Sequence, residues 1–456
     1  MGESLTSVGL DIGTTTSQMI LSRLTVENRA SSFAVPEMVI GNREVLYRGQ
    51  VHLTPLLGKD LVDAKALREI LLEEYQQSGI SREEVDTGAI IVTGETSRRE
   101  NARAVLEALS DLAGDFVVAT AGPDLESVLA ARGSGAVAWS AETGKRVLHM
   151  DIGGGTSNLA LIEKGEILRT GCMNVGGRLV KCDKEGIITY VSPVVEPLTS
   201  LRPGDRAREA ALRDLAGLLV RGLEGAAGLR EEPELMAHLA TREAGSLWQP
   251  PGEGCVLSFS GGVADCIREE QPPFAYGDMG PILGTAIRES RLWSGEHRLG
   301  EETIRATVIG AGCHSTQLSG STVYYRNVAF PLKNLPVVHL SEQEQEQDPA
   351  AALRKKLEAQ EGDAMISIPG FDSGGYNRIH ALAKEILRGT EGRPIYLAVA
   401  QDMAKALGQI LALNSPGERP ILCLDRVRPG PGSYLDVGAP VGPALRVVVK
   451  TLVLER

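Results

Sequence analysis

Two carboxylates occupy the same position in two copies of one short motif. Residues 11–17 read DIGTTTS and residues 151–157 read DIGGGTS, so Asp11 and Asp151 each precede a turn of small residues. Backbone N–H groups exposed in such a turn can bind the oxygens of an anion such as a phosphate. A carboxylate beside the turn can hold a hydrated divalent cation through its water molecules. The duplicated motif predicts two turns that bind one polyphosphate, with a magnesium ion held mainly through water by Asp11 and Asp151.

Largely apolar segments flank both motifs. They cover residues 8–10 and 18–21 around the first copy, and residues 147–150 and 158–162 around the second. This pattern predicts a strand, a tight turn and another strand in each copy. A single hairpin of this kind is usually only a turn, but two copies about one domain length apart indicate nucleotide binding.

Two common nucleotide motifs are excluded. The chain contains no Gly-x-x-x-x-Gly-Lys-Ser/Thr sequence, so it has no P-loop. The Rossmann fingerprint requires a helix after the glycine-rich turn, whereas a strand is predicted after each turn here.

A further glycine-rich turn follows the apolar strand predicted over residues 255–259. It reads Ser-Gly-Gly and leads into a helix, which lets a flat ligand lie directly against the backbone. The residues expected to contact a nucleotide are Gly13, Thr14, Thr15, Thr16, Gly153, Gly154, Gly155, Thr156, Gly261 and Gly262.

Length and charge limit the possible functions. A chain of 456 residues has room for two or three domains with ample core. A formal net charge of −12 argues against a nucleic-acid-binding surface and against affinity for anionic membranes. The N-terminal segment lacks a basic region followed by an apolar one, and no run reaches the roughly 18 apolar residues of a spanning helix. These features predict a cytoplasmic protein.

The metal-binding residue types are scattered. The six cysteines form no Cys-x-x-Cys pair, and the seven histidines form no i,i+4 pair. This pattern argues against zinc and iron–sulfur sites, so free buried thiols are expected.

The order of predicted elements divides the chain into three units. Residues 1–145 carry the first hairpin, residues 146–300 carry the second hairpin and the Gly-Gly turn, and residues 301–456 form a separate α/β domain. The stretch 197–250 is rich in Arg, Glu, Ala and Gly with weak helical periodicity, so a solvent-exposed helical insertion is expected there. The glycine-rich stretch 310–322 is expected to form turns between strands. The alternative is a surface that binds a ligand or a client, meaning a partner protein.

The order of the hairpins and the Gly-Gly turn resembles the superfamily of actin, the 70-kDa heat-shock proteins and the sugar kinases. The resemblance covers about residues 5–290. It implies an α/β fold of the actin-like ATPase type, in which two ribonuclease H-like subdomains face each other across a nucleotide cleft. It also implies ATP and Mg²⁺ as ligands, with adenosine at the Gly-Gly turn. The C-terminal α/β domain is an addition to that pattern.

The segment 124–133, which reads DLESVLAARG, resembles the linker helix of the heat-shock branch. In that register Asp124 occupies the place of the family's catalytic glutamate, which implies that Asp124 orients the attacking water. Glu126 is the alternative, and Asp124 could also act as the N-cap of a short helix. The phosphate-binding lysine of the heat-shock proteins has no match in this chain.

A more specific resemblance extends over the whole chain. Segments 92–101, 150–158, 257–264, 310–322 and 448–452 are similar to those of the reactivating factors of ethanolamine ammonia-lyase. The resemblance implies an ATP-dependent, chaperone-like protein that lets damaged cobalamin leave the client lyase so that adenosylcobalamin can enter. It also implies a cytoplasmic protein that can associate with a bacterial microcompartment, and it leaves a homodimer open.

Two other functions stay open at this point. A small-molecule kinase of the same fold would use Asp124 as the base. A nucleotide-dependent scaffold or filament protein of the actin type would have no catalytic acceptor. Neither explains the domain after residue 300.

Overall fold

The structure is a computed structural model. It describes residues 4–13, 16–28, 38–57, 61–93, 105, 108–109, 112, 118–120, 123–241, 248–251, 254–314, 317–319, 322–360, 362–371, 375–415, 417–429 and 433–451. Thr14 and Thr15, the loop at 94–96 and most of the helix predicted over 97–112 lie outside these ranges.

The first lobe is built on a sheet with the strand order β3-β2-β1-β7-β8. Its strands are β1 (Ser4–Ile12), β2 (Thr16–Asn28), β3 (Met38–Arg48), β7 (Thr87–Val92) and β8 (Val118–Thr120), with β4 (His52–Leu53) paired to β2. The short strands β5 (Leu56–Leu57) and β6 (Leu61–Val62) form a separate hairpin, and Arg82–Glu84 form a 3-10 turn. Strand β1 runs antiparallel to β2 and parallel to β7.

Helix α1 (Ala64–Ser78) covers this sheet, as the apolar spacing over residues 62–77 predicts. The Asp63 side chain caps its start by accepting hydrogen bonds from the backbone N–H groups of Lys65 and Ala66. Gly79 ends the helix with a φ of 70°, a left-handed conformation that glycine adopts without a steric penalty. The predicted helix and its glycine end are confirmed.

The second lobe repeats the sheet of the first lobe. Its strand order is β11-β10-β9-β14-β15, with β9 antiparallel to β10 and parallel to β14. Its strands are β9 (Arg146–Ile152), β10 (Ser157–Glu163), β11 (Glu166–Met173), β14 (Val256–Ser260) and β15 (His297–Leu299), with β12 (Val180–Cys182) and β13 (Ile188–Val191) paired separately. Because the sequence repeat is also a repeat of strand order, the predicted fold with two ribonuclease H-like units is confirmed.

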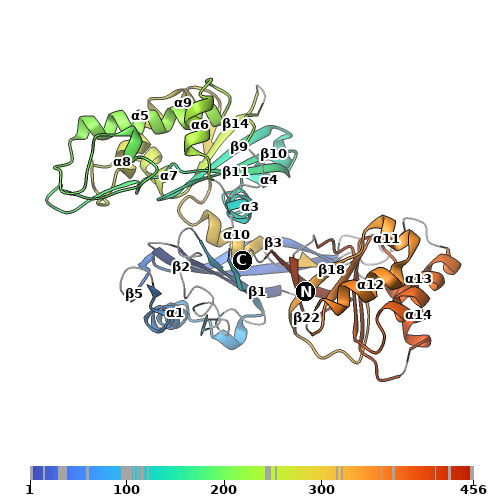
Figure 1. Cartoon of the computed structure of the whole chain (residues 1–456). Helices are drawn as coiled ribbons and strands as arrows, with labels where there is room; N and C mark the ends of the chain where they lie inside the picture. Colours follow the sequence, from blue (N-terminus) through green and yellow to red (C-terminus); the bar gives the residue numbers. More distant parts are fainter. Residues whose placement is uncertain are drawn as a thin grey trace.

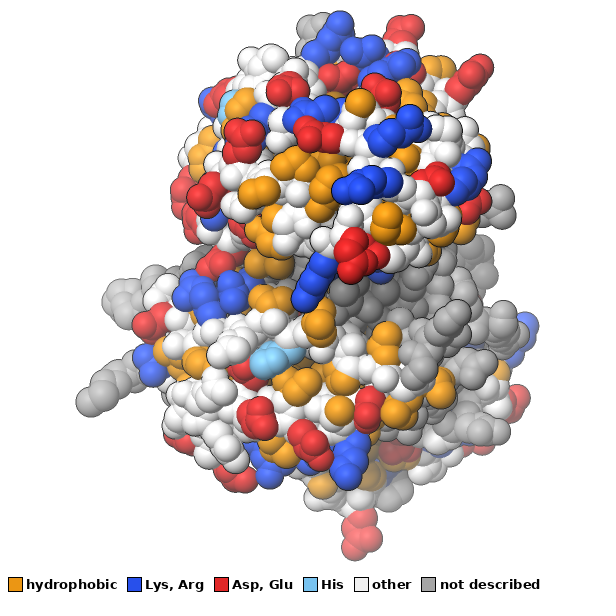
Figure 2. Space-filling model, turned by 90° about the vertical axis from the view of Figure 1, so that its left-hand side faces the viewer, with side chains coloured by type: hydrophobic (Ala, Val, Ile, Leu, Met, Phe, Trp, Pro, Cys, Tyr) orange, Lys and Arg blue, Asp and Glu red, His pale blue; other side chains and the backbone are white. Residues whose placement is uncertain are grey.

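Two helices lie between the lobes and pack against each other (Figure 1). Helix α3 (Pro123–Gly133) follows the first sheet along the chain and packs against β9, β10 and β11 of the second. Helix α10 (Ala306–His314) follows the second sheet and packs against β1, β2 and β7 of the first. The boundaries proposed at residues 145 and 300 stay predictions. Helix α3, which precedes residue 145, contacts the second lobe, and helix α10, which follows residue 300, contacts the first lobe. Seen from the side of β5, the second lobe lies above the first (Figure 2).

The expectation of turns over residues 310–314 is wrong, because these residues belong to helix α10. The glycines serve close packing instead. A Cβ at Gly310 would lie 2.1 Å from the carbonyl oxygen of Leu129 in α3, and a Cβ at Gly312 would lie 3.0 Å from the amide nitrogen of Gly9 in β1. On the facing helix, a Cβ at Gly133 would lie 1.9 Å from the carbonyl oxygen of Ala306. Glycine therefore lets the two helices and β1 approach to backbone contact.

The stretch 197–250 is helical, as predicted, but its main helix is not a solvent-exposed insertion. Helix α5 (Glu209–Ala226) buries one long face, including Leu212, Leu219 and Leu223, in the core of the second lobe. Apolar residues recur there at helical spacing, so the helix packs on α8 and completes the core. The remaining helices of this lobe are α4 (Ala136–Thr143), α6 (Pro233–Leu239), α7 (Gly262–Arg268), α8 (Gly280–Arg288) and α9 (Arg291–Ser294), with a 3-10 turn at Glu196–Leu198.

The C-terminal part forms an α/β domain with the strand order β16-β23-β22-β18-β19-β20-β21-β17. Strands β18 to β21 run parallel, and helices α12, α13 and α14 connect them and cover one face. The antiparallel pair β22–β23 contributes to the core on the other face. Its elements are β16 (Gln317–Leu318), β17 (Tyr324–Arg326), β18 (Leu332–His339), α11 (Glu342–Gln347), α12 (Pro349–Glu358), β19 (Met365–Ile368), α13 (Tyr376–Gly389), β20 (Ile395–Val399), α14 (Ala404–Leu413), β21 (Ile421–Asp425), β22 (Ser433–Val441) and β23 (Ala444–Thr451).

This domain contacts the first lobe. Val441 of β22 packs with Leu5 and Leu24 of the first sheet, and Arg446 donates a hydrogen bond of 2.5 Å to the carbonyl oxygen of Asp86. No helix in the described ranges is long and apolar enough to cross a membrane. All six cysteines are free thiols, as predicted.

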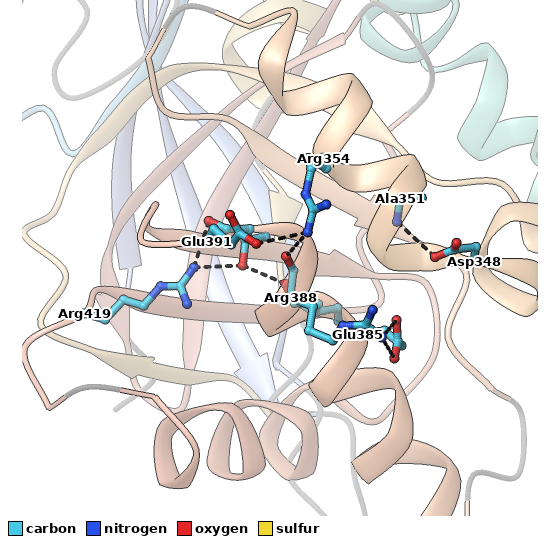
Figure 3. A network of polar contacts seen from close by, with 9 residues as sticks. Asp348, Ala351, Arg354, Glu385, Arg388, Glu391 and Arg419 are labelled. Carbon is cyan, nitrogen blue, oxygen red and sulfur yellow. Dashed lines mark hydrogen bonds and ion pairs between the residues drawn. The ribbon is translucent and has the colours of Figure 1, made fainter.

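Hydrogen bonds from arginine side chains link the segments around α12, the end of α13 and the start of β21 (Figure 3). Arg419, just before β21, donates to the carbonyl oxygens of Thr390 and Arg393, which follow α13. Arg354 of α12 donates to the carboxylate of Glu391 over 3.0 Å. The network therefore holds α12, the end of α13 and the start of β21 to one another.

Candidate functional site

The two duplicated hairpins are closed by the same hydrogen bond. In the first hairpin, the N–H of Gly13 donates to the carbonyl oxygen of Thr16 over 2.9 Å, and in the second hairpin Gly153 donates to Thr156 over 2.9 Å. Both hairpins are also in the same register, with Asp11 paired to Gln18 and Asp151 paired to Asn158. The predicted flanking strands are confirmed in both copies, and the predicted turn is confirmed in the second copy. Thr14 and Thr15 lie outside the described residues, so the structure does not test their contacts.

Asp11 stands near the end of β1 and receives a hydrogen bond from the neighbouring strand. The Thr93 hydroxyl, which follows β7, donates to Asp11 Oδ1 over 2.8 Å. Burial raises the pKa of Asp11 to about 7, the Thr93 hydrogen bond lowers it, and the negative charges of Glu126 and Asp151 raise it further. Carboxylates from both lobes and from α3 therefore converge at this point.

Asp151 has a matching environment near the end of β9. It is buried, and the Ser260 hydroxyl at the end of β14 donates a hydrogen bond to its Oδ1. Burial raises the pKa of Asp151 to about 6, and the Ser260 hydrogen bond lowers it. Thr93 and Ser260 thus have the same role in the two lobes. Sequence reasoning missed both as partners of the aspartates, although each lies at the end of the strand parallel to the aspartate's own strand.

The repeat extends one residue further than the sequence motif suggested. Gln18 and Asn158 follow the two motifs directly, and both side chains are buried opposite the aspartates. Gln18 Nε2 donates to the carbonyl oxygen of Ile304 over 3.3 Å, and Asn158 Nδ2 donates to Glu126 Oε2 over 2.9 Å. Among the described residues, neither carboxamide oxygen has a hydrogen-bond partner.

These residues fit a hydrated magnesium ion. Oxygen ligands are the ones that magnesium prefers, and the ion usually keeps several of its water molecules. Asp11 and Asp151 supply carboxylates, while the oxygens of Gln18 and Asn158 can accept hydrogen bonds from bound water. A cation would also reduce the repulsion among the acidic groups that raises the pKa of Asp11.

The structure separates the two candidates for the catalytic carboxylate. Asp124 lies in the first turn of α3 rather than at its N-cap. It is exposed, and its Oδ1 accepts a hydrogen bond of 2.6 Å from the Thr170 hydroxyl on β11. Glu126 is buried and bonded to Asn158, and its charge acts on Asp11. The structure therefore brings Glu126, the alternative in the sequence analysis, together with Asp11 and Asp151.

The Gly-Gly turn lies against the second hairpin. Gly261 has a φ of 85°, and a Cβ there would lie 2.3 Å from the carbonyl oxygen of Ile152. Its N–H donates to the carbonyl oxygen of Thr303 over 3.1 Å, and α7 begins at Gly262. Only glycine fits this position, so the turn can pack tightly against the end of β9.

Arg178 places a cation beside the second hairpin. Its backbone N–H donates to the carbonyl oxygen of Gly154 over 2.6 Å, and its side chain lies against Gly154. Its Nε donates to Asp278 over 3.2 Å. Sequence reasoning missed this residue. The available signal was Gly176-Gly177 directly before it, since a Cβ at Gly176 would lie 2.3 Å from the carbonyl oxygen of Gly154.

Comparison with known proteins gives one family. The profile of the ethanolamine utilisation protein EutA matches residues 3–455. The chain is 37% identical over 473 residues to the ethanolamine ammonia-lyase reactivase EutA of Salmonella typhimurium, covering 98% of each chain. It is 37% identical over 471 residues to the protein of that name from Escherichia coli, again covering 98% of each. Among solved structures, the ethanolamine utilization protein EutJ from Carboxydothermus hydrogenoformans is 18% identical with a TM-score of 0.33, covering 67% of this chain and 88% of that one.

Proposed function

The chain belongs to the ethanolamine utilisation protein EutA family, and on this basis we propose that it is an ATP-dependent reactivating factor for ethanolamine ammonia-lyase. It releases damaged cobalamin from the lyase so that intact adenosylcobalamin can bind. One observation carries the nucleotide part of this proposal: Asp11, Glu126 and Asp151 converge at the two matched hairpins.

The nucleotide phosphates bind to the hairpin turns. The turn residues 13–16 and 153–156 bind the β and γ phosphates from the two lobes, through N–H groups other than those of Gly13 and Gly153, which close the hairpins. The adenosine lies at Gly261 and Gly262. Arg178 adds a positive charge beside the second turn. Gly155 at the tip of the second hairpin is exposed, and Gly153, Gly154 and Thr156 are partly exposed, which supports this assignment.

Asp11 and Asp151 hold the water shell of Mg²⁺, assisted by Gln18 and Asn158. When bound, the cation neutralises charge on the phosphates and on the carboxylates. The four side chains occupy equivalent positions in the two hairpins, which supports a site shared between the lobes.

Glu126 orients the water that attacks the terminal phosphate. Its buried carboxylate is fixed by Asn158 and lies near enough to Asp11 to raise the pKa of that group. Asp124 has the weaker claim, because its carboxylate accepts a hydrogen bond from Thr170 at the surface. Hydrolysis in such a site depends mainly on positioning and on neutralising charge.

Nucleotide state changes the relation of the lobes through α3 and α10. Both helices join the two lobes, and Gly133 and Gly310 let them meet at backbone distance. Rigid-body movement about such a contact is a common way to couple a bound ligand to a distant surface. The C-terminal domain moves with the first lobe through Val441 and Arg446, and a client-binding surface there would follow the nucleotide state.

One experiment tests the function. The protein is mixed with Mg²⁺ and ATP, with and without ethanolamine ammonia-lyase that holds a damaged cobalamin, and phosphate release and lyase activity are measured after adenosylcobalamin is added. We expect phosphate release and recovery of lyase activity, with Glu126→Gln as the matched inactive control. Transfer of phosphate to a small acceptor without recovery would instead indicate a kinase. Nucleotide-dependent assembly without recovery would indicate a scaffold.

A further inference from the structure

His149 is a buried histidine that the proposed chemistry does not use. It lies on β9, two residues before Asp151, and is fully inaccessible to solvent. Three serine hydroxyls surround its ring. Nδ1 lies 3.1 Å from Ser258 Oγ, while Nε2 lies 3.0 Å from Ser260 Oγ and 3.3 Å from Ser134 Oγ. The ring therefore contacts both β14 and the residue directly after α3.

The hydrogen bonds around this ring have a direction that follows from counting protons. A serine hydroxyl carries one proton, and Ser260 uses it to donate to Asp151 Oδ1. Ser260 must then accept the hydrogen bond from His149, so Nε2 carries a proton. Ser134 supports this assignment, because its hydroxyl donates to the carbonyl oxygen of Ala131 over 3.2 Å and leaves only lone pairs for Nε2.

The hydrogen bond at Nδ1 of His149 completes the series. The described hydrogen-bond partners of the ring are three neutral serine hydroxyls and no carboxylate, which fits an uncharged ring. A neutral ring protonated at Nε2 accepts at Nδ1, and Ser258 supplies the donor there. The hydrogen bonds therefore run in one direction, from Ser258 through His149 and Ser260 to Asp151. Such a chain strengthens each bond and favours negative charge at its end.

We propose that His149 is a positioning residue that fixes Ser260 as a donor to Asp151, so that Asp151 is held as an oriented anion for the water shell of the cation. The inference rests on the proposed nucleotide site and adds a residue that touches neither nucleotide nor metal. In the competing arrangement, these hydrogen bonds run in the opposite direction. In it, Asp151 is protonated and donates to Ser260, Ser260 donates to Nε2, and the ring proton lies on Nδ1.

The first test determines the direction of the hydrogen bonds around His149 without any ligand. The full chain is labelled with ¹⁵N-histidine, and the ring nitrogen and carbon shifts of His149 are assigned by comparison with His149→Gln. We expect the tautomer with the proton on Nε2. A proton on Nδ1 would overturn the proposal, whatever the protein does with ATP.

The second test measures how strongly ATP binding depends on Mg²⁺ when His149 is replaced. ATP binding to the wild-type chain, His149→Leu and His149→Gln is measured by calorimetry as a function of Mg²⁺ concentration. Leucine keeps an apolar volume but removes donor and acceptor, so we expect the Mg²⁺ concentration for half-maximal binding to rise about tenfold. Glutamine can donate to Ser260 through Nε2, and we expect it to stay within about threefold of the wild type. Metal-free ATP binding should be the same in all three.

Equal Mg²⁺ dependence in the wild type and His149→Leu, or failure of glutamine to restore it, would refute the positioning role. If His149→Leu does not fold, as judged by circular dichroism, Ser260→Ala removes the same donor to Asp151 and must give the same tenfold shift. A wild-type chain that binds ATP without Mg²⁺ dependence would refute the proposed metal site, while the tautomer would still decide the direction of the hydrogen bonds.

Discussion

The side-chain amide of Asn158 donates a hydrogen bond of 2.9 Å to Oε2 of Glu126. This contact joins β10, the second strand of the second hairpin, to helix α3, and both side chains are buried. Asp124, two residues before Glu126 on the same helix, bonds to Thr170 on the next strand instead. Residues two apart on a helix point in nearly opposite directions, so only one of the two carboxylates can face Asp11.

Replacing Glu126 by Gln should lower the rate of ATP hydrolysis by about 10²–10³-fold, because a positioned carboxylate contributes a factor of that size. Nucleotide affinity should change little, since the amide keeps the size and hydrogen bonds of the side chain. Asp124→Asn is the matched control and should keep most of the activity. The measurement is single-turnover release of phosphate from Mg²⁺–ATP. A large loss in Asp124→Asn with normal hydrolysis in Glu126→Gln would return the catalytic role to Asp124.

The duplicated hairpins could be predicted from the sequence because their cause is local. Gly, Thr and Ser at fixed positions between apolar segments specify a tight turn in any context, and the repeated register pairs Asp11 with Asp151. The choice between Asp124 and Glu126 could not be made in this way. It depends on the contact with Asn158, which lies in a different element.

Glycine was the main source of error. A glycine marks either a backbone with positive φ or a close approach of two backbones, and sequence alone does not distinguish the two. Gly79 is of the first kind and Gly261 is of both kinds, and both turns were predicted correctly. Gly310 and Gly312 are of the second kind, so a helix was mistaken for turns. Helix α5 was expected at the surface because the stretch 197–250 is rich in Arg, Glu, Ala and Gly and its helical periodicity is weak over the whole stretch, whereas α5 alone has a clear buried face.

Gly133→Ala should destabilise the protein by about 1–3 kcal/mol, the usual cost of forcing extra atoms into a packed site. The new Cβ would lie 1.9 Å from the carbonyl oxygen of Ala306, so α3 and α10 would have to separate. Gly217→Ala in α5 is the control. A Cβ there meets nothing within 4 Å, and alanine should stabilise that helix by about 0.5–1 kcal/mol. Thermal unfolding of both variants measures the difference, and a stabilising Gly133→Ala would contradict the packing described here.

Arg419→Met should destabilise the C-terminal domain by about 1–3 kcal/mol, because the substitution leaves carbonyl oxygens without a charged donor. Arg419 donates to the carbonyl oxygens of Thr390 and Arg393 (Figure 3). Arg388→Met provides the comparison. Its side chain is 69% exposed and pairs with Glu385 one helical turn away, so a loss of only about 0.2–0.5 kcal/mol is expected. Equal losses in urea unfolding would show that Arg419 acts as an ordinary surface residue.

Glu344→Gln should change how the stability of the protein depends on pH. Hydrogen bonds from Lys356 and from the backbone N–H of Ser341 lower the pKa of Glu344 to about 2. A carboxylate with a lowered pKa in the folded state stabilises the protein above its unfolded pKa of about 4.3, and this contribution is lost as pH falls through about 2. Glutamine can keep the helix-capping hydrogen bond but carries no charge.

The wild type should therefore exceed Glu344→Gln in stability at pH 5–7 by less than about 1 kcal/mol, since both partners are partly exposed. The difference should shrink steadily between pH 5 and pH 2. Urea unfolding across this range measures it, and Lys356→Met in the same series completes a double-mutant cycle. If the charge pair is responsible, the coupling between the two substitutions should disappear at the acid end of the range. A coupling that is constant with pH would assign the effect to the neutral hydrogen bonds instead.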